Sequence, residues 1–436
     1  MKYYSTNKNS PVATLSEAVI KGLAPDKGLY MPEHIITLPE EFFYSIENLS
    51  FQQISCRVAE AFFGEEIPPA DLNRIVCDTL SFDTPVVHVG GNIYSLELFH
   101  GPTAAFKDVG ARFMARMLSY FINQSGLKEH VTVLVATSGD TGSAVANGFL
   151  GVDGIDVIVL YPKGKVSEIQ EKQFTTLGKN ITAVEIDGTF DDCQRLVKQA
   201  FINNELNRHF KLTSANSINV ARFLPQAFYY FNAWAQLNKT GKGKDFVICV
   251  PSGNFGNITA GLFARKMGLP VKRFIAANNS NDIFLKYLHS GVYKPRPSIV
   301  TLANAMDVGD PSNFVRVLEL YEGDIDKIRS DIEAFSYDDT KISEAINRVY
   351  RTTRYLLDPH GACGYLALKE GLKGNETGVF LETAHPAKFL DTVEPITGEK
   401  VPIPDTLLRF MDGHKSAVPL SSDFDDFRKY LLSRQP

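Results

Sequence analysis

The chain has 436 residues, a length that predicts two or more packed units rather than a single core. Its composition of 44% hydrophobic and 22% charged residues is that of an ordinary globular protein and excludes the biases of collagen, disordered chains and membrane spans. With 45 basic and 50 acidic residues the formal net charge is -5, which argues against a chain held to nucleic acid by its overall charge.

The amino-terminal segment, residues 1–17, has neither the apolar core of a signal peptide nor the Arg-rich character of a transit peptide. No apolar run in the sequence approaches the roughly 18 residues that a membrane helix needs. We therefore expect a cytoplasmic protein with no membrane partner.

The first 85 residues contain two helical patterns, at 15–23 and 51–63, and few strand signals. This predicts a mainly helical subdomain over residues 1–85.

Further along the chain, short β-branched runs that are apolar on both faces predict parallel strands at 131–136, 155–161, 181–186 and 246–250. They alternate with helical patterns at 166–177, 191–206 and 219–237. The sequence thus predicts a multidomain α/β fold, with parallel twisted sheets flanked by helices. Two further units are expected, at 86–225 and 226–436. Residues 294–311 are expected to be an irregular connection.

Residues 100–108 combine a Pro-Gly turn with the start of a helix that is expected to continue past Arg112. Lys107 stands in the first turns of that helix, among alanine and phenylalanine. Desolvation and the positive end of the helix dipole both lower the pKa of such a lysine toward the neutral amine that a nucleophile needs. The alternative interpretation is a solvated surface lysine, or one paired with Asp108.

A glycine turn at 138–143 directly follows the predicted strand 131–136 and opens a helix of small residues. Hydroxyl residues and glycines in such a turn leave backbone N–H groups available to an anion at a helix amino terminus. The alternative is a tight strand-to-helix turn with Asp140 or Thr141 as the N-cap. Taken alone, the segment does not decide between the two.

A second glycine turn, at 252–257, follows the predicted strand 246–250 and again opens a helix. It is closer to a phosphate cradle than the first. No Lys-Ser or Lys-Thr follows its last glycine, so it is not a Walker A loop, and it does not match the G-x-G-x-x-G dinucleotide fingerprint. ATP and NAD are therefore poorly supported as ligands.

Cysteine and histidine do not form a metal-binding pattern. The five cysteines are widely spaced and contain no Cys-x-x-Cys pair, which suits a reducing compartment. The spacing of His360 and Cys363 has no second pair to complete a tetrahedral site. We expect no metal.

These segments, in this order, resemble the threonine synthase family of the longer bacterial and fungal type, within the tryptophan-synthase-β-like, fold-type II group of pyridoxal-phosphate enzymes. The resemblance begins at Tyr3-Tyr4-Ser5-Thr6 and at residues 27–32, Lys-Gly-Leu-Tyr-Met-Pro. It extends to residues 382–389, Glu-Thr-Ala-His-Pro-Ala-Lys-Phe, and so covers nearly the whole chain.

The resemblance implies pyridoxal 5'-phosphate as cofactor. It places the Schiff-base lysine at Lys107, with Phe106 packed beside the cofactor ring. It implies that Thr383 is the partner of the pyridine nitrogen, where a hydroxyl leaves that nitrogen largely unprotonated. The residues implied to bind the cofactor phosphate are those of the second glycine turn: Gly253, Asn254, Phe255, Gly256 and Asn257.

The resemblance also implies two substrate sites. The first glycine turn matches the family's loop for the amino-acid carboxylate, with Ser138, Gly139, Asp140 and Thr141. The wider group often has asparagine at the third of these positions, so the contact of Asp140 with the phenolic oxygen is left unassigned. Residues 216–222 resemble the site for the substrate phosphate, through a hydroxyl, an amide and a planar guanidinium from Ser217, Asn219 and Arg222. An Asn219 N-cap and a surface arginine are the alternative.

The implied reaction converts O-phosphohomoserine and water to threonine and phosphate by γ-elimination and β-addition of water, with Lys107 also moving protons. A related dehydratase or β-replacing synthase acting on serine-type substrates is the alternative, because it shares Lys107 and the second glycine turn but does not need Ser217 and Arg222. A non-enzymatic relative would be expected to lack the lysine. The oligomeric state is open.

Overall fold

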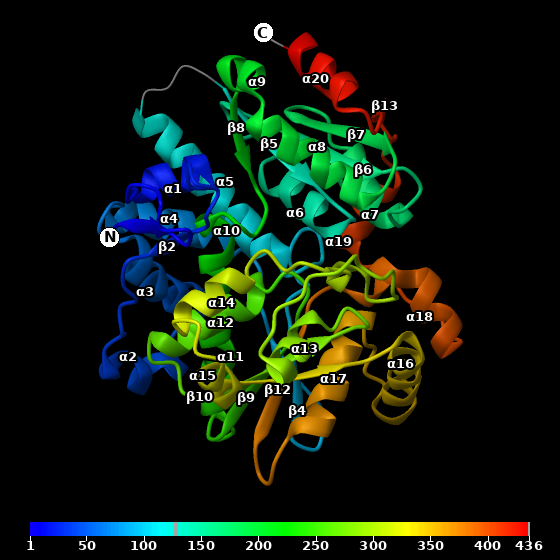
Figure 1. The fold of residues 1–436 in the computed structure, drawn as a ribbon. Coiled ribbons are helices and arrows are strands. Elements are labelled where there is room, and N and C mark those ends of the chain that lie inside the picture. The colour runs from blue at the N-terminus through cyan, green and yellow to red at the C-terminus, as the bar shows by residue number, and fades with distance from the viewer. Residues whose placement is uncertain (126–129, 435–436) are drawn as a thin grey trace.

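The computed structural model describes residues 1–125 and 130–434. Two halves, each built on a largely parallel sheet, lie one above the other in Figure 1, and the amino-terminal helices flank them on one side. The carboxy-terminal helix α20 (Phe424–Ser433) returns to the upper half. The predicted α/β class is confirmed.

The amino-terminal region is mainly helical, as predicted. Helix α3 matches the predicted range, begins at a capping box of Ser50 and Gln53, and buries residues spaced by three or four: Phe51, Ile54, Val58 and Phe62. Helix α1 ends at Lys21, before the predicted 23, because Gly22 adopts a positive φ of 70°. The elements are β1 (Tyr3–Ser5), α1 (Leu15–Lys21), β2 (Tyr30–Pro32), α2 (Glu40–Ser45), η1 (Ile46–Asn48), α3 (Phe51–Phe63) and α4 (Pro69–Thr79).

The upper half contains a parallel sheet of five strands in the order β13-β7-β6-β5-β8. Alternate residues of its strands enter different cores: Val133 packs in the cluster that contains Val145 of α6, and Leu134 in the cluster that contains Leu196 of α8. Helices therefore cover both faces, as the apolar runs predict. The elements are β5 (Val131–Ala136), α6 (Asp140–Gly148), β6 (Ile155–Pro162), α7 (Glu168–Thr175), β7 (Ile181–Asp187), α8 (Phe190–Ile202), α9 (Asn204–His209), β8 (Lys211–Ser214), α19 (Asp405–Met411) and β13 (Val418–Ser421).

Two predicted helices are interrupted. The pattern at 191–206 divides into α8 and α9 at Asn203, whose side chain accepts the backbone N–H of Leu206 and so starts a new helix. The pattern at 219–237 divides into α10 (Val220–Phe223), η2 (Leu224–Gln226) and α11 (Ala227–Lys239), because Pro225 has no N–H to continue the α-helical ladder. The periodicity survives these breaks, and so it cannot reveal them.

The lower half contains a sheet of six strands in the order β11-β10-β9-β12-β4-β3, parallel except for the β3–β4 hairpin. Residues 294–311, all of them described, contain η3 and otherwise irregular backbone, as predicted. The elements are β3 (Val86–Gly90), β4 (Ile93–Glu97), β9 (Phe246–Pro251), α12 (Gly256–Lys266), β10 (Val271–Asn278), α13 (Ile283–Ser290), η3 (Asn304–Met306), α14 (Phe314–Leu320), α15 (Ile325–Asp331), β11 (Ile332–Ser336), α16 (Asp339–Thr353), α17 (Pro359–Gly371), β12 (Thr377–Glu382), η4 (Pro386–Phe389) and α18 (Leu390–Thr397).

The sheets exchange strands across the predicted unit boundaries. Strands β3 and β4 lie in the predicted unit 86–225 but join the sheet of β9 and β12, and β13 of the predicted unit 226–436 joins β7. The hairpin covers the edge of β12 and β13 covers the edge of β7, so these edges gain hydrogen-bonded neighbours from distant sequence. The division into three units stays a prediction, although its boundaries do not coincide with the sheets.

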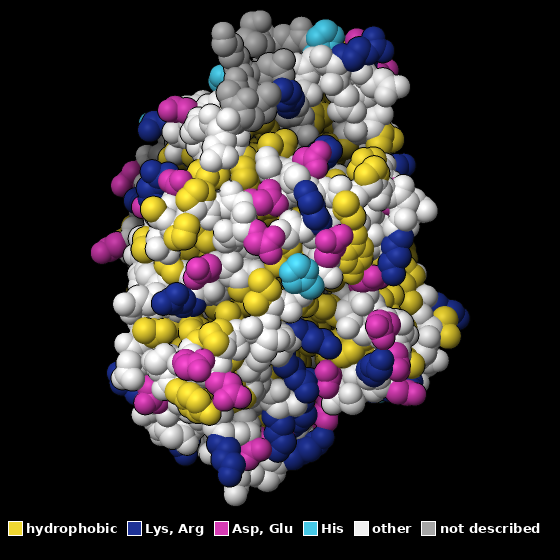
Figure 2. Space-filling model, turned by 90° about the vertical axis from the view of Figure 1, so that its left-hand side faces the viewer, with side chains coloured by type: hydrophobic (Ala, Val, Ile, Leu, Met, Phe, Trp, Pro, Cys, Tyr) yellow, Lys and Arg dark blue, Asp and Glu magenta, His cyan; other side chains and the backbone are white. Residues whose placement is uncertain are grey.

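The face in Figure 2 carries lysine, arginine, aspartate and glutamate side chains interspersed with apolar ones. This mixture agrees with the near balance of acidic and basic residues. Within residues 1–125 and 130–434, no helix is long and apolar enough to cross a membrane.

The carboxyl ends of parallel strands point to the place where ligands bind. The first glycine turn follows β5, the second follows β9, and Thr383 follows β12. In open α/β sheets, ligands bind outside the carboxyl ends of the strands. A site is therefore expected where these three segments and the start of α5 (Lys107–Ser125) come together.

Candidate active site

The segment before Lys107 is joined to the segment that contains Thr383. The backbone N–H of Phe106 donates to the carbonyl of Thr383 at 2.9 Å, and the N–H of His385 donates to the carbonyl of Ala104 at 3.0 Å. Ala104 reaches this position with a positive φ of 53°, an uncommon conformation for a residue with a Cβ. This short antiparallel contact sets Lys107 and Thr383 side by side although they are far apart in sequence.

Lys107 is the first residue of α5, and its side chain is only 16% exposed. Its Nζ lies 3.8 Å from Oδ2 of Asp140. Burial lowers the pKa of Lys107, the positive charges of Lys388 and Arg222 lower it further, and Asp140 opposes the shift. The interpretation of Lys107 as a solvated surface cation is therefore wrong.

Asp108 does not pair with Lys107. Its carboxylate accepts the backbone N–H of Thr103 at 2.9 Å and the hydroxyl of Thr103 at 2.6 Å. Asp108 is buried, and these bonds close the turn that leads into α5. The alternative pairing considered from sequence is wrong because Asp108 is fully used in holding the turn.

Asp140 lies between two ammonium groups. Its Oδ1 is 2.6 Å from Nζ of Lys388 and accepts from Nε2 of Gln170 at 2.9 Å, and its Oδ2 faces Lys107. Burial opposes ionisation of Asp140, but the charges of Lys388 and Lys107 outweigh it and lower the pKa of its carboxyl well below the usual range. We call Lys107, Asp140 and Lys388 the charged centre.

The first glycine turn is not capped by Asp140 or Thr141, so the N-cap interpretation is wrong. Gly139 is the N-cap of α6, and so no side chain caps this helix. The hydroxyl of Thr137 accepts the backbone N–H groups of Gly139 and Gly142 at 2.9 and 2.8 Å. The turn is thus shaped from behind by Thr137, and Asp140 faces the charged centre. Ser138 and Thr141 are half-buried beside it, and their contact with a substrate carboxylate stays a prediction.

The second glycine turn is tightly enclosed. A Cβ on Gly253 would lie 2.7 Å from Cα of Met306, and one on Gly256 would lie 3.0 Å from Cβ of Ser217. Phe255 adopts a left-handed conformation at the N-cap of α12 and is buried against the ring of Phe284. At Gly253 the neighbouring backbone leaves no room for a Cβ, so only glycine fits there.

The side chain of Asn257 provides a test of whether the turn fits a phosphate. Its Oδ1 accepts hydroxyl hydrogens from Tyr229 and Tyr230, both at 2.7 Å, which directs its amide nitrogen. Among the residues that the structure describes, no group accepts a hydrogen bond from this buried Nδ2. An unsatisfied buried donor at the start of a helix is what an anion would satisfy. These residues fit a phosphate group.

Ser217 is held by two asparagines. Nδ2 of Asn254 and Nδ2 of Asn313 donate to its Oγ at 3.1 and 3.0 Å. Since both amides donate, the hydroxyl hydrogen of Ser217 remains available to a further acceptor. We call Ser217, Asn254 and Asn313 the amide cluster. It joins the residue predicted for the substrate phosphate to one predicted for the cofactor phosphate.

Arg316 of α14 fastens the amide cluster to the rest of the chain. It is fully buried and donates to the carbonyls of Ser217, Ile218 and Tyr30 and to Oδ1 of Asn313. Neither Asn313 nor Arg316 was found from sequence. No motif marks them, because an isolated arginine on a helical pattern is usually a solvated surface residue.

Arg222 and Asn219 differ from each other in what they leave free. Arg222 is buried, so its interpretation as a surface arginine is wrong. Its Nη1 donates to the carbonyl of Ala215 at 2.7 Å, whereas its buried Nε has no acceptor within the described chain. Burial lowers the pKa of Arg222 to about 10. The amide of Asn219 caps α10 and donates to Val19, so it is occupied at both ends, and its contact with substrate stays a prediction.

The segment after β12 is positioned by a buried acidic residue. Asp358, the N-cap of α17, accepts the N–H of Ala384 at 3.1 Å through Oδ2. Thr383 is buried, and so are its neighbours Ala384 and Glu382. Burial, together with the charge of Asp358, raises the pKa of Glu382 well above its usual value. Thr383 therefore presents its hydroxyl from a fixed backbone. The role of that hydroxyl toward a ring nitrogen stays a prediction.

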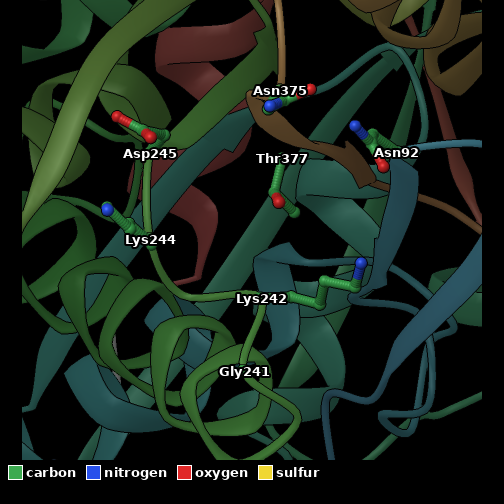
Figure 3. Close-up of a pocket in the computed structure, with 7 residues that line it drawn as sticks. All are labelled: Asn92, Gly241, Lys242, Lys244, Asp245, Asn375 and Thr377. Carbon is green, nitrogen blue, oxygen red and sulfur yellow. The ribbon is translucent and has the colours of Figure 1, made fainter.

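The pocket in Figure 3 lies elsewhere. It has a volume of about 360 Å³, and Thr377, Asp245 and Asn92 stand at the amino ends of β12, β9 and β4. The glycine turns and Thr383 stand at the carboxyl ends, so this pocket is on the opposite edge of the sheet. Over the described ranges, no three His, Cys, Asp or Glu side chains are grouped so that they could hold a metal ion.

Comparison with protein families gives three matches that together cover most of the chain. A pyridoxal-phosphate dependent enzyme model matches residues 79–383. A model described as the threonine synthase N terminus matches residues 2–80, and one described as threonine synthase, C-terminal, matches residues 361–431.

Individual proteins match over their whole length. The threonine synthase of Haemophilus influenzae is 45% identical, over 99% of this chain and 100% of that protein, and the Escherichia coli threonine synthase is 44% identical over 100% of both. The crystal structure of the Escherichia coli protein covers 100% of both chains with a TM-score of 0.93. A pyridoxal-phosphate-bound threonine synthase from Brucella melitensis, 37% identical, also has a TM-score of 0.93 over 100% of this chain and 99% of that one.

Proposed function

Because the chain belongs to the threonine synthase family of pyridoxal-phosphate-dependent enzymes, we propose that it converts O-phosphohomoserine and water to threonine and phosphate, with Lys107 as the residue that carries the cofactor. The observation that carries the assignment of Lys107 is its place in the structure. Its side chain is largely buried, its pKa is lowered, and it starts a helix whose preceding residues pair with the Thr383 segment.

The residues present are suited to pyridoxal phosphate. The second glycine turn would hold the phosphate through its backbone and through Nδ2 of Asn257, and Thr383 would face the ring nitrogen. The ring of Phe106, whose centroid is 5.3 Å from Nζ of Lys107, would lie beside the cofactor. When bound, the cofactor supplies an electron sink for charge that develops on the substrate.

Lys107 would then act as the proton carrier. A general base must be unprotonated near neutral pH, and burial favours the neutral amine of Lys107. With cofactor and substrate held beside it, the amine of Lys107 would accept the α-proton and return a proton later in the reaction. Asp140 and Lys388 keep the charge around Lys107 nearly balanced while the proton moves.

The substrate phosphate would bind to Arg222 and Ser217. Arg222 has an unsatisfied buried Nε, and the hydroxyl hydrogen of Ser217 is available. A guanidinium facing the leaving phosphate stabilises the charge that develops there, an effect that is typically about 10²–10³-fold in rate. The first glycine turn would bind the substrate carboxylate through Ser138, Gly139 and Thr141.

The test begins with an absorbance spectrum of the purified protein and of Lys107→Ala, with Lys163→Ala, an exposed lysine, as the matched control. We expect a visible Schiff-base band in the wild type and the control, and none in Lys107→Ala. The same proteins are then assayed for phosphate and threonine release from O-phosphohomoserine. Loss of both products in Lys107→Ala alone would support the proposal.

Other outcomes separate the alternatives. A visible band with no phosphate release, together with a 2-oxo acid formed from serine or threonine, would move the function to a dehydratase. A wild type that shows no band after addition of pyridoxal phosphate would contradict the role of Lys107.

A further inference from the structure

Lys388 is a buried lysine that the reaction above does not use directly. It lies in η4, and its side chain has no exposed surface. Its Nζ donates to the carbonyl of Thr103 at 2.9 Å and is 2.6 Å from Oδ1 of Asp140. Lysines are almost never buried unless they are paired, because an ammonium group that leaves water loses its hydration.

The position of Lys388 is determined by the same segment that positions Thr383. The side chain of His385 accepts the N–H of Ala387 and so starts η4 directly after the Ala105–Ala384 contact. Ser167, which precedes α7 of the upper half, donates to the carbonyl of Lys388 at 3.3 Å. Lys388 therefore extends from the lower half of the molecule to Asp140 in the upper half.

The carboxylate of Asp140 lies between two lysine side chains, Lys107 and Lys388, which approach different oxygens. Lys107 approaches one carboxylate oxygen at 3.8 Å, whereas Lys388 lies close to the other. An unbalanced carboxylate at this distance would favour the protonated form of Lys107. The charged groups that act on Lys107 from the elements around it are Asp140 at the start of α6, Lys388 in η4, Arg222 in α10 and Asp358 at the start of α17.

We propose that Lys388 is a positioning residue: its ammonium fixes the Asp140 carboxylate beside Lys107 and offsets its negative charge, and so keeps the nitrogen of Lys107 easy to deprotonate. This inference rests on the proposed function of Lys107. Because charge is the essential property, Lys388 and Asp140 form one unit, and removing both disturbs Lys107 less than removing Lys388 alone. A lysine that only anchors η4 would not have this property.

The test uses the holoenzyme of four variants: Lys388→Met, Asp140→Asn, the double variant, and Lys163→Met as an exposed control. The measurement is the pH at which the visible absorption band of the bound cofactor titrates, with the pH profile of kcat as a second readout. A charge within about 4–6 Å of an ionisable group shifts the pKa of that group by about 1–3 units. We expect the titration to move up by about one unit or more in Lys388→Met, down in Asp140→Asn, and back toward wild type in the double variant.

An unshifted titration in Lys388→Met, or a double variant no closer to wild type than Lys388→Met, would overturn the inference and leave Lys388 as an anchor of η4. If Lys388→Met does not fold, Lys388→Gln replaces it, since glutamine keeps a donor for Asp140 without the charge, and the same shift is expected. A failure of the proposed function looks different: the wild type itself would then show no visible band and release no threonine.

Discussion

The charged centre and the amide cluster are two buried polar regions built on different principles. The charged centre consists of ionisable groups from α5, α6 and η4, in which the carboxylate of Asp140 lies between the amines of Lys107 and Lys388. The amide cluster consists of neutral groups joined by hydrogen bonds, in which the hydroxyl hydrogen of Ser217 remains available to a further acceptor. Ions respond to pH and to the loss of a partner charge, whereas amides respond mainly to the loss of a hydrogen bond. The first suits proton transfer and the second suits holding an anion without changing protonation.

The largest effect is expected at Arg222, which belongs to neither region but acts on Lys107 through its charge. Arg222→Lys keeps the charge but loses the planar fork, so we expect kcat/KM for O-phosphohomoserine to fall about 10²–10³-fold while the visible band of the cofactor is retained. Steady-state kinetics and the absorbance spectrum check this. Arg195→Lys, an exposed arginine paired with Asp192, is the control and should behave as wild type. Loss of the band in Arg222→Lys would contradict the assignment of Arg222 to the substrate phosphate rather than to the cofactor.

Arg316 tests whether the amide cluster depends on complete hydrogen bonding. Arg316→Met leaves the carbonyls of Ser217, Ile218 and Tyr30 without their donor, so we expect the free energy of unfolding to fall by about 3 kcal/mol. Urea unfolding of the holoenzyme measures this. Arg329, which donates to carbonyls from an exposed position, is the matched control, and Arg329→Met should cost much less. Equal losses in the two variants would argue against the importance of burial.

The surroundings of the charged centre are expected to make stability depend on pH through His385. Burial, together with the charge of His100, lowers the pKa of His385 from 6.5 to about 4. The unfolded chain therefore binds a proton below pH 6.5 that the folded chain does not, so this contribution to stability is complete above pH 6.5 and is lost as the pH falls toward 4.

His385→Asn keeps a side-chain acceptor for Ala387 but cannot be protonated. Between pH 7 and pH 5 the wild type should lose about 2 kcal/mol more stability than this variant. The difference arises over the roughly 1.5 pH units between 6.5 and 5, at about 1.36 kcal/mol for each pH unit. Urea unfolding of both holoenzymes at the two pH values measures the difference. Parallel losses in both proteins would show that His385 titrates normally in the folded state.

The smallest effect is expected at Ser217. Ser217→Ala removes the acceptor of the amides of Asn254 and Asn313, so the free energy of unfolding should fall by about 1 kcal/mol. The decrement should be the same at pH 5 and pH 7, because no member of the amide cluster titrates in that range. Ser433→Ala, at an exposed serine, should have no measurable effect. A pH-dependent decrement would contradict the contrast between the two regions.

Much of the site could be predicted because its residues are contiguous in sequence. Lys107 follows its own turn, and each glycine turn lies directly between a strand and a helix, so a short motif contains both the chemistry and its local geometry. Asn219 shows the limit of this approach. Its residue type suits a phosphate site and an N-cap equally well, and only the bonds to Ala221 and Val19 show that the amide is occupied.

By itself, the sequence determined the class of fold, the three inner strands of the upper sheet, strand β9 of the lower sheet, the helix that begins near Lys107, and the family to which the chain is similar. Apolar periodicity and glycine turns are local properties, and they survive in any tertiary context. Only the tertiary structure decided that β3 and β4 join the sheet of β12, that Arg316 supports Ser217, and that Lys388 balances Asp140. These contacts join residues from about 100 to 300 positions apart, and long-range packing, unlike local periodicity, leaves no pattern in neighbouring residues.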